Sequence, residues 1–277
     1  MEKDLKSVLA ENGFGFKKKF GQNFITDKNL LASIVAQSGA ERDDTVLEIG
    51  CGAGTLTRAI AERVNRVFAF EVDKTLQPVL ETTLSGLDNV QVVFKDFLKV
   101  NLPELEKEIG EYSVIANLPY YVTTPLITKL LEEGKTCKSL TVMVQEEVAL
   151  RLCARENTPD YGAITAAIAL SASAEIIKKV PRTMFMPRPN VDSAVVKLTI
   201  QRGRIAVSDE QLYKKVVHAA FASRRKTLEN NLVNTFGFSR EVAQKILSSC
   251  NVDLRARGET LSPEQFASLT EAIKNNR

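Results

Sequence analysis

The chain has 277 residues, of which 44% are hydrophobic and 26% are charged, a composition typical of a protein that buries a sizeable core. It contains no run of about 18 apolar residues, so we expect no membrane-spanning helix. The N-terminal segment is charged and lacks the apolar stretch of a secretory signal, and we therefore expect a cytoplasmic location. The net charge of +3 is too small to indicate a partner.

The four cysteines and the single histidine exclude several kinds of site. The cysteines are far apart and form no Cys-x-x-Cys pair, so neither a disulfide framework nor a zinc site is expected. With His218 as the only histidine, a Ser-His-Asp triad is also disfavoured. We therefore expect no metal, and we interpret His218 and the cysteines as structural residues.

Strand-forming runs alternate with helical patterns through the first 200 residues. Most of the strand runs are continuously apolar, as in parallel sheets that helices cover on both faces. The alternation therefore predicts an α/β fold. Strands are predicted at residues 45–49, 66–72, 90–94, 112–117, 139–144, 176–180 and 194–200. Helical patterns lie at residues 56–63, 75–85, 125–133 and 146–154.

After residue 200 the pattern changes to a polar, basic segment at 201–208 and then to helical patterns only. Residues 201–277 hold 13 Lys and Arg against 8 Asp and Glu, an excess that is compatible with a polyanionic partner or with a solvated surface. Helix starts are expected at Ser208, Ser223, Ser239 and Ser262. We predict two domains, residues 1–202 with an N-terminal arm at 1–26, and a small helical domain at 203–277.

A glycine-rich turn follows the first predicted strand and precedes a helical pattern. Gly50, Gly52 and Gly54 form a GxGxG spacing, which differs from the GxGxxG spacing of dinucleotide-binding turns. Glycines permit a tight turn and let a ligand touch the backbone. The turn suits a nucleoside that carries an amino acid, although many strand–helix turns use glycine and this turn alone is weak support.

Two acidic residues end the next two strands, where open α/β sheets bind ligands. Glu71 can accept hydrogen bonds from both hydroxyl groups of a ribose, and Asp96 can accept one from an adenine amine. Phe97 offers a backbone N–H and an apolar wall. Each acid alone is more often a cap or turn residue, but the combination with the glycine turn favours a methyl-donor site over a nicotinamide site.

The tetrapeptide Asn117-Leu118-Pro119-Tyr120 follows the fourth predicted strand. An adenine amine is a poor nucleophile because its lone pair is delocalised into the ring. The side-chain oxygen of Asn117 and the backbone carbonyl of Leu118 can accept its two N–H groups and free the lone pair. Pro119 stiffens the loop, and Tyr120 can stack on the base. Catalysis then depends on positioning and polarisation without a strong base.

A target base must leave its stack to reach such a pocket, and a second aromatic face would hold it there. Phe185 is the candidate for this second face. The alternative is a core phenylalanine beside a proline-rich turn, and without context that alternative is favoured.

Together these motifs resemble those of the ribosomal RNA adenine dimethyltransferase family over nearly the whole chain. The resemblance extends beyond the glycine turn, the two acids and Asn117–Tyr120 to residues 19–25, 185–193 and 221–232. It implies a class I S-adenosylmethionine-dependent methyltransferase fold, a Rossmann-like sheet with a small C-terminal all-helical domain. Cys51 stands where many relatives carry proline, and we expect donor binding to survive because the turn relies on its glycines.

The resemblance also implies the reaction. S-Adenosyl-L-methionine would be the donor, and the acceptors would be two adjacent adenosines near the 3′ end of small-subunit (16S) ribosomal RNA, each dimethylated, in an immature 30S particle. Tyr120 and Phe185 would sandwich the flipped adenine, and we expect a monomer that acts in ribosome biogenesis. Arg224, Arg225 and Lys226 would bind RNA phosphates. By this resemblance, the residues that bind the methyl donor would be Asn23, Ile25, Gly50, Glu71, Asp96 and Asn117. The arguments from the glycine turn and the strand ends add Gly52 and Phe97.

Four alternatives remain at this point. The nearest is an antibiotic-resistance methylase that acts on large-subunit RNA, although residues 224–232 favour the small-subunit enzyme. A second is an assembly factor whose methylation is secondary, which is compatible with the enzyme. A DNA-binding transcription factor derived from this fold is disfavoured because the loop Asn117–Tyr120, the acceptor loop, is intact. A nicotinamide dehydrogenase is disfavoured by the GxGxG spacing.

Overall fold

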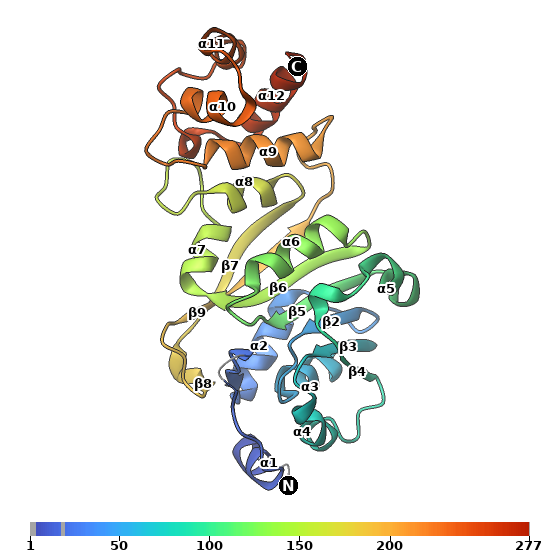
Figure 1. Ribbon diagram of the computed structural model, residues 1–277. Helices are drawn as coiled ribbons and strands as arrows, with labels where there is room; N and C mark the ends of the chain where they lie inside the picture. Colours follow the sequence, from blue (N-terminus) through green and yellow to red (C-terminus); the bar gives the residue numbers. More distant parts are fainter. Residues whose placement is uncertain (1–3, 18–19, 277) are drawn as a thin grey trace. The chain divides into compact units, whose positions relative to one another are not determined.

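The computed structural model describes residues 4–17 and 20–276 (Figure 1). Lys19, the first residue of the segment 19–25 singled out in the sequence, therefore lies outside the described residues. No helix formed by the described residues is long and apolar enough to cross a membrane. The larger sheet consists of β2 (Thr45–Ile49), β3 (Arg66–Glu71), β4 (Val90–Phe94), β5 (Tyr112–Asn117), β6 (Cys137–Gln145), β7 (Ala172–Val180) and β9 (Ser193–Ile200).

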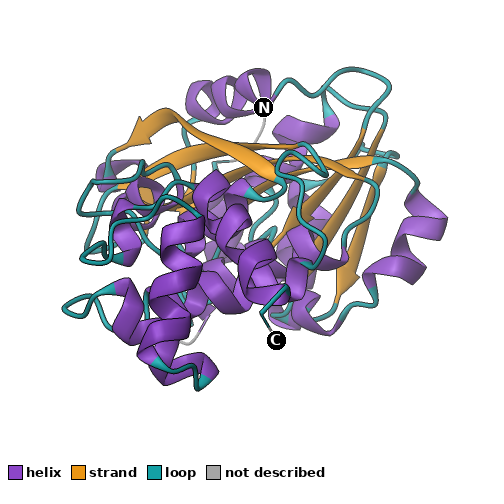
Figure 2. Ribbon diagram, turned by 90° about the horizontal axis from the view of Figure 1, so that it is seen from above, coloured by secondary structure: helices purple, strands orange, loops and turns teal. Residues whose placement is uncertain are grey.

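Within the described residues, this sheet has the strand order β4-β3-β2-β5-β6-β9-β7, and Figure 2 shows its strands as one twisted layer. The strands from β4 to β6 pair in parallel, as predicted. β9, however, pairs antiparallel with β6, so the parallel pairing that the apolar runs indicated is wrong for this strand. A continuous apolar run indicates a covered strand but not its direction.

A second, two-stranded sheet is formed by segments that the sequence patterns did not predict as strands. β1 (Phe24–Ile25) pairs antiparallel with β8 (Phe185–Met186), so that Ile25 lies opposite Phe185. This pairing joins the N-terminal arm to the segment that precedes β9. Runs of two residues are too short for hydrophobic periodicity to be recognised.

Helices α2 (Lys28–Ser38) and α3 (Thr55–Ala61) pack on one face of the larger sheet. Leu31 and Ile34 of α2 and Ile60 of α3 form one buried cluster with Val46 of β2 and Val67 of β3. The other helical elements of the sheet-containing region are α1 (Leu5–Glu11), η2 (Lys74–Leu76), α4 (Gln77–Thr83), η3 (Phe97–Lys99), α5 (Leu102–Ile109), α6 (Thr123–Glu133), α7 (Glu146–Leu152) and η4 (Arg182–Met184).

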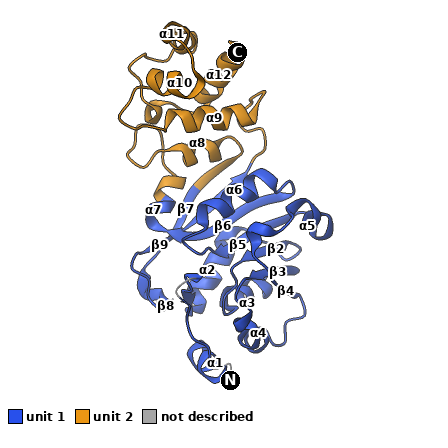
Figure 3. Ribbon diagram, viewed as in Figure 1, with its two compact units in different colours: residues 1–149, 175–200 blue, residues 150–174, 201–277 orange. Residues whose placement is uncertain are grey.

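The chain divides into two compact units, residues 1–149 with 175–200 and residues 150–174 with 201–277 (Figure 3). The sequence pattern predicted a first domain that runs without interruption to residue 202, whereas residues 150–174 group with the helical unit. Because α8 shares a hydrophobic core with the C-terminal helices, this grouping follows from packing rather than from chain order. The helical unit contains α8 (Ala163–Ala169), α9 (Glu210–Ala220), α10 (Leu228–Phe236), α11 (Arg240–Ser249), η5 (Gly258–Thr260) and α12 (Pro263–Lys274).

Two of the four predicted helix starts in this unit are confirmed, because Ser239 and Ser262 are the N-caps of α11 and α12. α9 begins one residue later than expected, after the N-cap Asp209. Ser223 begins no helix, since α10 starts only after the N-cap Thr227. The residues between α9 and α10 instead form a turn.

Candidate active site

The glycine-rich turn lies at the carboxyl end of β2 and contacts three other segments closely. The backbone N–H of Gly50 donates to the carbonyl of Phe70 at 2.8 Å, which ties the turn to β3. Gly52 has a φ of +55°, and a Cβ atom there would lie 2.7 Å from the ring of Phe24 in β1. A Cβ on Gly50 would lie 3.4 Å from Pro119 Cδ. The glycines therefore let the arm and the Asn117–Tyr120 loop approach the same turn.

Glu71 ends β3 and holds this turn with its carboxylate. Its Oε2 accepts a hydrogen bond from the backbone of Gly52 at 2.9 Å, and its Oε1 accepts from Val72 and Asp73 at 2.8 Å each. Burial raises the pKa of Glu71, although these three backbone donors oppose the effect. Since each carboxylate oxygen has two lone pairs, the group retains capacity to accept from a ligand.

Asp96 and Phe97 follow β4 and form another wall of the site. Asp96 is half-buried and caps η3, because its Oδ1 accepts from the backbone of Leu98 at 3.0 Å. Phe97 is 2% exposed, and its ring meets Phe70 edge-on with 5.1 Å between centroids. A carboxylate and an apolar wall therefore lie side by side at the end of the sheet.

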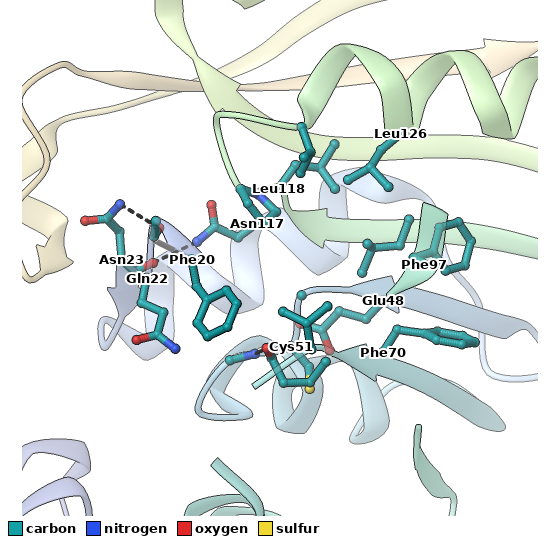
Figure 4. A pocket seen from close by; sticks show the side chains of 18 of the residues that line it. Phe20, Gln22, Asn23, Glu48, Cys51, Phe70, Phe97, Asn117, Leu118 and Leu126 are labelled. Atoms are coloured by element: carbon teal, nitrogen blue, oxygen red, sulfur yellow. Dashed lines mark hydrogen bonds between the residues drawn. The ribbon is translucent and has the colours of Figure 1, made fainter. Parts of the chain in front are cut away.

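These elements enclose a cavity of about 310 Å³. Its wall is formed mainly by five segments, residues 20–25, 48–52, 70–72, 95–98 and 117–122. Figure 4 shows side chains from the arm, the strand ends and the acceptor loop around it. Among the lining residues are ten of the predicted site residues, namely Asn23, Ile25, Gly50, Gly52, Glu71, Asp96, Phe97, Asn117, Leu118 and Tyr120.

Asn117 ends β5 with its side-chain amide in a defined orientation. Its Nδ2 donates to the backbone carbonyl of Asn23 at 2.9 Å, a bond that is drawn in Figure 4. The Oδ1 atom accepts no hydrogen bond from the described part of the chain. The backbone N–H of Leu118 donates to Met143 of β6 at 3.1 Å, whereas the Leu118 carbonyl accepts none from the described residues. Two acceptor oxygens are therefore available beside the cavity.

The arm is fastened over the cavity by an ion pair. Lys17 Nζ lies 2.7 Å from Asp73 Oδ1, and Gln22 Nε2 donates to Asp73 Oδ2 at 2.9 Å. Burial raises the pKa of Asp73, but hydrogen bonds from Lys17, Thr75 and Gln22 outweigh this effect and lower the pKa to about 2. The ionised Asp73 therefore anchors Lys17 and Gln22 of the arm beside the end of β3.

Phe185, the proposed second aromatic face, does not line this cavity. It lies in β8, is only 6% exposed and belongs to the buried cluster that contains Ile25 and Leu31. Tyr120 does line the cavity, and its hydroxyl makes a 2.7 Å hydrogen bond with Ser193 Oγ. Burial raises the pKa of Tyr120, so the phenol is neutral near pH 7.

Several lining residues were not predicted from the sequence. Val72, Leu98 and Tyr121 are large apolar residues that are 42%, 37% and 59% exposed and contribute to the wall. Each of the three directly follows a predicted site residue, and that adjacency was the available signal. Glu48 also lines the cavity, its Oε2 is buried without a partner among the described residues, and burial raises its pKa to about 8.

The three basic residues predicted to bind RNA lie in the turn between α9 and α10 of the helical unit, and all three are exposed. Arg224 donates from Nη2 to the carbonyls of Pro159 and Tyr161, at 3.4 and 3.3 Å. The side chains of Arg225 and Lys226 have no hydrogen-bond or ion-pair partner among the described residues. Arg224 thus also holds the unit together, while its two neighbours are free to bind a ligand.

Comparison with known proteins finds ribosomal RNA methyltransferases among both the sequence relatives and the solved structures. The sequence model of the family described as ribosomal RNA adenine dimethylase matches residues 13–275. A protein named ribosomal RNA small subunit methyltransferase A from Geobacillus thermodenitrificans is 47% identical, over 97% of this chain and 94% of its own length. A relative with the same name from Bacillus licheniformis is 45% identical, over 97% and 95%.

Two solved structures share the fold. The 23S rRNA methyltransferase ErmE is 28% identical, with a TM-score of 0.70 over 91% of this chain and 100% of that one. A dimethyladenosine transferase from Plasmodium falciparum is 23% identical, with a TM-score of 0.80 over 91% and 98%.

Proposed function

Because the chain belongs to the ribosomal RNA adenine dimethylase family, we propose that it transfers methyl groups from S-adenosylmethionine to the exocyclic amines of adenosines in small-subunit ribosomal RNA. Relatives that are 45–47% identical over nearly the whole chain carry the name small subunit methyltransferase A. We propose the same RNA, with two adjacent adenosines near its 3′ end dimethylated to N6-dimethyladenosine.

The residues at the strand ends fit S-adenosylmethionine as a ligand. Glu71 would accept hydrogen bonds from the ribose hydroxyls, and Asp96 would accept one from the adenine amine. Val72 and Leu98 would supply apolar surfaces for the purine, consistent with their exposure at the cavity. S-Adenosylmethionine would supply a methyl group bonded to a positively charged sulfur. The arm residues Asn23 and Ile25 would close the site because they line the same cavity.

The observation that carries the proposal is the pair of available acceptor oxygens on Asn117 and Leu118 at the wall of this cavity. An adenine amine presents two N–H groups, and these oxygens would accept one each. This polarises the amine and frees its lone pair for attack. The amine can lose its proton after methyl transfer, so no strong base is needed, and the chemistry depends on positioning.

The target base would stack on Tyr120, which lines the cavity. We keep Phe185 as the proposed second aromatic face because its strand β8 pairs with the arm strand β1, whose Ile25 lines the cavity. Phe185 would have to turn out of its buried cluster to reach a base, so this role requires a rearrangement when RNA binds.

We propose that the helical unit recognises RNA through Arg225 and Lys226, whose side chains are exposed and unpaired within the described chain. Phosphate contacts would give affinity without sequence specificity. Arg224 would add a contact only with the part of its guanidinium that does not bind Pro159 and Tyr161. We further propose that the protein acts as a monomer, in the cytoplasm, on an immature 30S particle during ribosome biogenesis.

A direct experiment tests the function. Purified protein and labelled S-adenosylmethionine would be incubated separately with small and large ribosomal subunits from cells that lack this protein. Label should enter only the small subunit, and mass spectrometry should find two dimethyladenosines near the 3′ end of its RNA. Label in the large subunit alone would instead assign the reaction named for ErmE. Absence of label from both subunits would reject the methyltransferase proposal.

A further inference from the structure

Through its hydroxyl group, Tyr120 contacts a strand of the sheet that lies far away in the sequence. Its hydroxyl oxygen lies 2.7 Å from Ser193 Oγ, across a separation of 73 residues. Ser193 is 1% exposed and is the first residue of β9. Tyr120 is the partner of the buried Ser193 hydroxyl among the described residues, so the bond satisfies a group that would otherwise be buried without a partner.

Ser193 has a rigid position because the beginning of β9 is held on both sides. In the sheet it pairs with Gln145 of β6. The preceding residue, Asp192, accepts from the backbone of Glu146 through its carbonyl at 3.0 Å and from the backbone of Arg182 through its Oδ1 at 2.9 Å. The serine hydroxyl is therefore presented from a fixed backbone.

Besides the Asn117–Asn23 bond, the acceptor loop has two further long-range anchors, and they have different roles. The backbone of Leu118 bonds to Met143 of β6, which positions the catalytic carbonyl. Within the described chain, the only hydrogen bond to the Tyr120 hydroxyl is the one with Ser193, and the other bond at this residue is the local contact from Thr123 Oγ1 to its carbonyl at 3.5 Å. Without Ser193, the backbone would still be held, but the ring would lose its polar anchor.

From this geometry we infer that Ser193 is a positioning residue, which fixes the ring of Tyr120 as the wall against which the target adenine stacks. The inference rests on the proposed function, since it assigns a partner to the stacking residue of that same site. Ser193 does not touch the reacting atoms. It acts by removing rotational freedom from the tyrosine ring before the base enters.

The first test is spectroscopic and does not depend on the methyl donor. The full-length protein would be labelled with 3-fluorotyrosine, and the resonance of Tyr120 among the five tyrosines would be identified by its loss in Tyr120→Phe. In Ser193→Ala this resonance should shift and narrow, because the ring becomes mobile. The matched control is Ser113→Ala. Ser113 is a buried residue at the opposite end of β5, and this change removes its 3.1 Å hydrogen bond with Ser139 of β6.

The second test is kinetic, with small subunits that lack the dimethyladenosines as substrate. Ser193→Ala and Tyr120→Phe should each lower kcat/KM for the RNA by about 3- to 10-fold, as expected for one lost hydrogen bond, while KM for S-adenosylmethionine stays unchanged. The double variant should be no slower than the slower single variant, because both changes remove the same bond. Ser193→Thr, which retains the hydroxyl, should restore the Tyr120 resonance.

Two results would overturn the inference. One is an unchanged Tyr120 resonance in Ser193→Ala, and the other is a double variant whose loss is the product of the two single losses. Failure of the proposed function is distinguishable. If Asn117→Ala were fully active, the acceptor site itself would be wrong, whatever Ser193→Ala does. If Asn117→Ala were inactive and Ser193→Ala behaved as wild type, only the positioning role would be lost.

Discussion

The side-chain amide of Asn117 donates to the backbone carbonyl of Asn23 across 2.9 Å. The two residues lie on different walls of one cavity, the first at the end of β5 and the second in the N-terminal arm. Because Nδ2 is occupied by Asn23, the oxygen of the same amide is left to accept from a ligand. The arm, which we propose closes the donor site, therefore also orients the proposed acceptor group.

Replacement of Asn117 tests this relationship. Asn117→Ala removes the polarising oxygen, and we expect kcat to fall by about 100- to 1000-fold. Asn117→Asp keeps an oxygen but loses the donor, and its carboxylate would repel the carbonyl of Asn23, so it should also be impaired. Single-turnover methylation of small subunits measures both effects. Wild-type turnover in Asn117→Ala would reject the acceptor role.

Gly52→Ala should weaken donor binding beyond the effect of backbone strain. A Cβ at this position would lie 2.7 Å from Phe24, and φ is +55°. The matched control is Gly86→Ala, where φ is +80° but no atom lies within 4 Å of the added carbon. Both variants should lose stability by about 1–2 kcal/mol through left-handed strain.

The two glycine variants are then compared by calorimetric titration with S-adenosylmethionine. Only Gly52→Ala should show weaker binding, because only there must the arm strand β1 move. Equal affinities in the two variants would contradict the proposed closure of the site by the arm.

Glu48→Gln should change how stability depends on pH. Burial raises the pKa of Glu48 from 4.5 to about 8, so the folded state binds a proton that the unfolded state releases between these values. The stability that comes from this proton is fully present below pH 4.5 and is lost as the pH rises through about 8. A glutamine cannot ionise, so the variant should gain stability relative to the wild type as the pH rises.

Thermal denaturation at pH 5 and pH 9 measures this gain. The Tm of Glu48→Gln minus that of the wild type should increase by about 5 °C or more over this interval. Glu62→Gln, at a glutamate whose side chain is 62% exposed, should show no such trend. A constant difference at Glu48 would mean that this carboxyl group ionises normally in the folded protein.

Charge reversal in the turn before α10 tests the RNA surface. Arg225→Glu and Lys226→Glu should weaken binding to small subunits and reduce the slope of log K against log salt by about one for each phosphate that is no longer bound. The control is Lys245→Glu, at an exposed lysine of α11 in the same unit. An equal weakening at Lys245 would indicate a general charge effect and no specific phosphate binding at the turn.

Local sequence patterns determined most of the α/β framework and brought together the residues of the proposed donor site. β2, β4 and β5 have the predicted bounds, because continuous apolar runs that end in polar or glycine residues define strands without reference to the rest of the chain. Glu71 and Asp96 could be placed together for a related reason. The carboxyl ends of parallel strands meet at one edge of a sheet.

Tertiary structure alone decided the contacts between segments that are far apart in the chain. The Asn23–Asn117 bond spans 94 residues and the Tyr120–Ser193 bond spans 73, so no local pattern could indicate either. The same holds for Phe185, which β1–β8 pairing keeps in the core, and for residues 150–174, which share a core with helices that follow residue 209. Hydrophobic periodicity shows that a residue is buried, whereas its partner depends on how the whole chain packs.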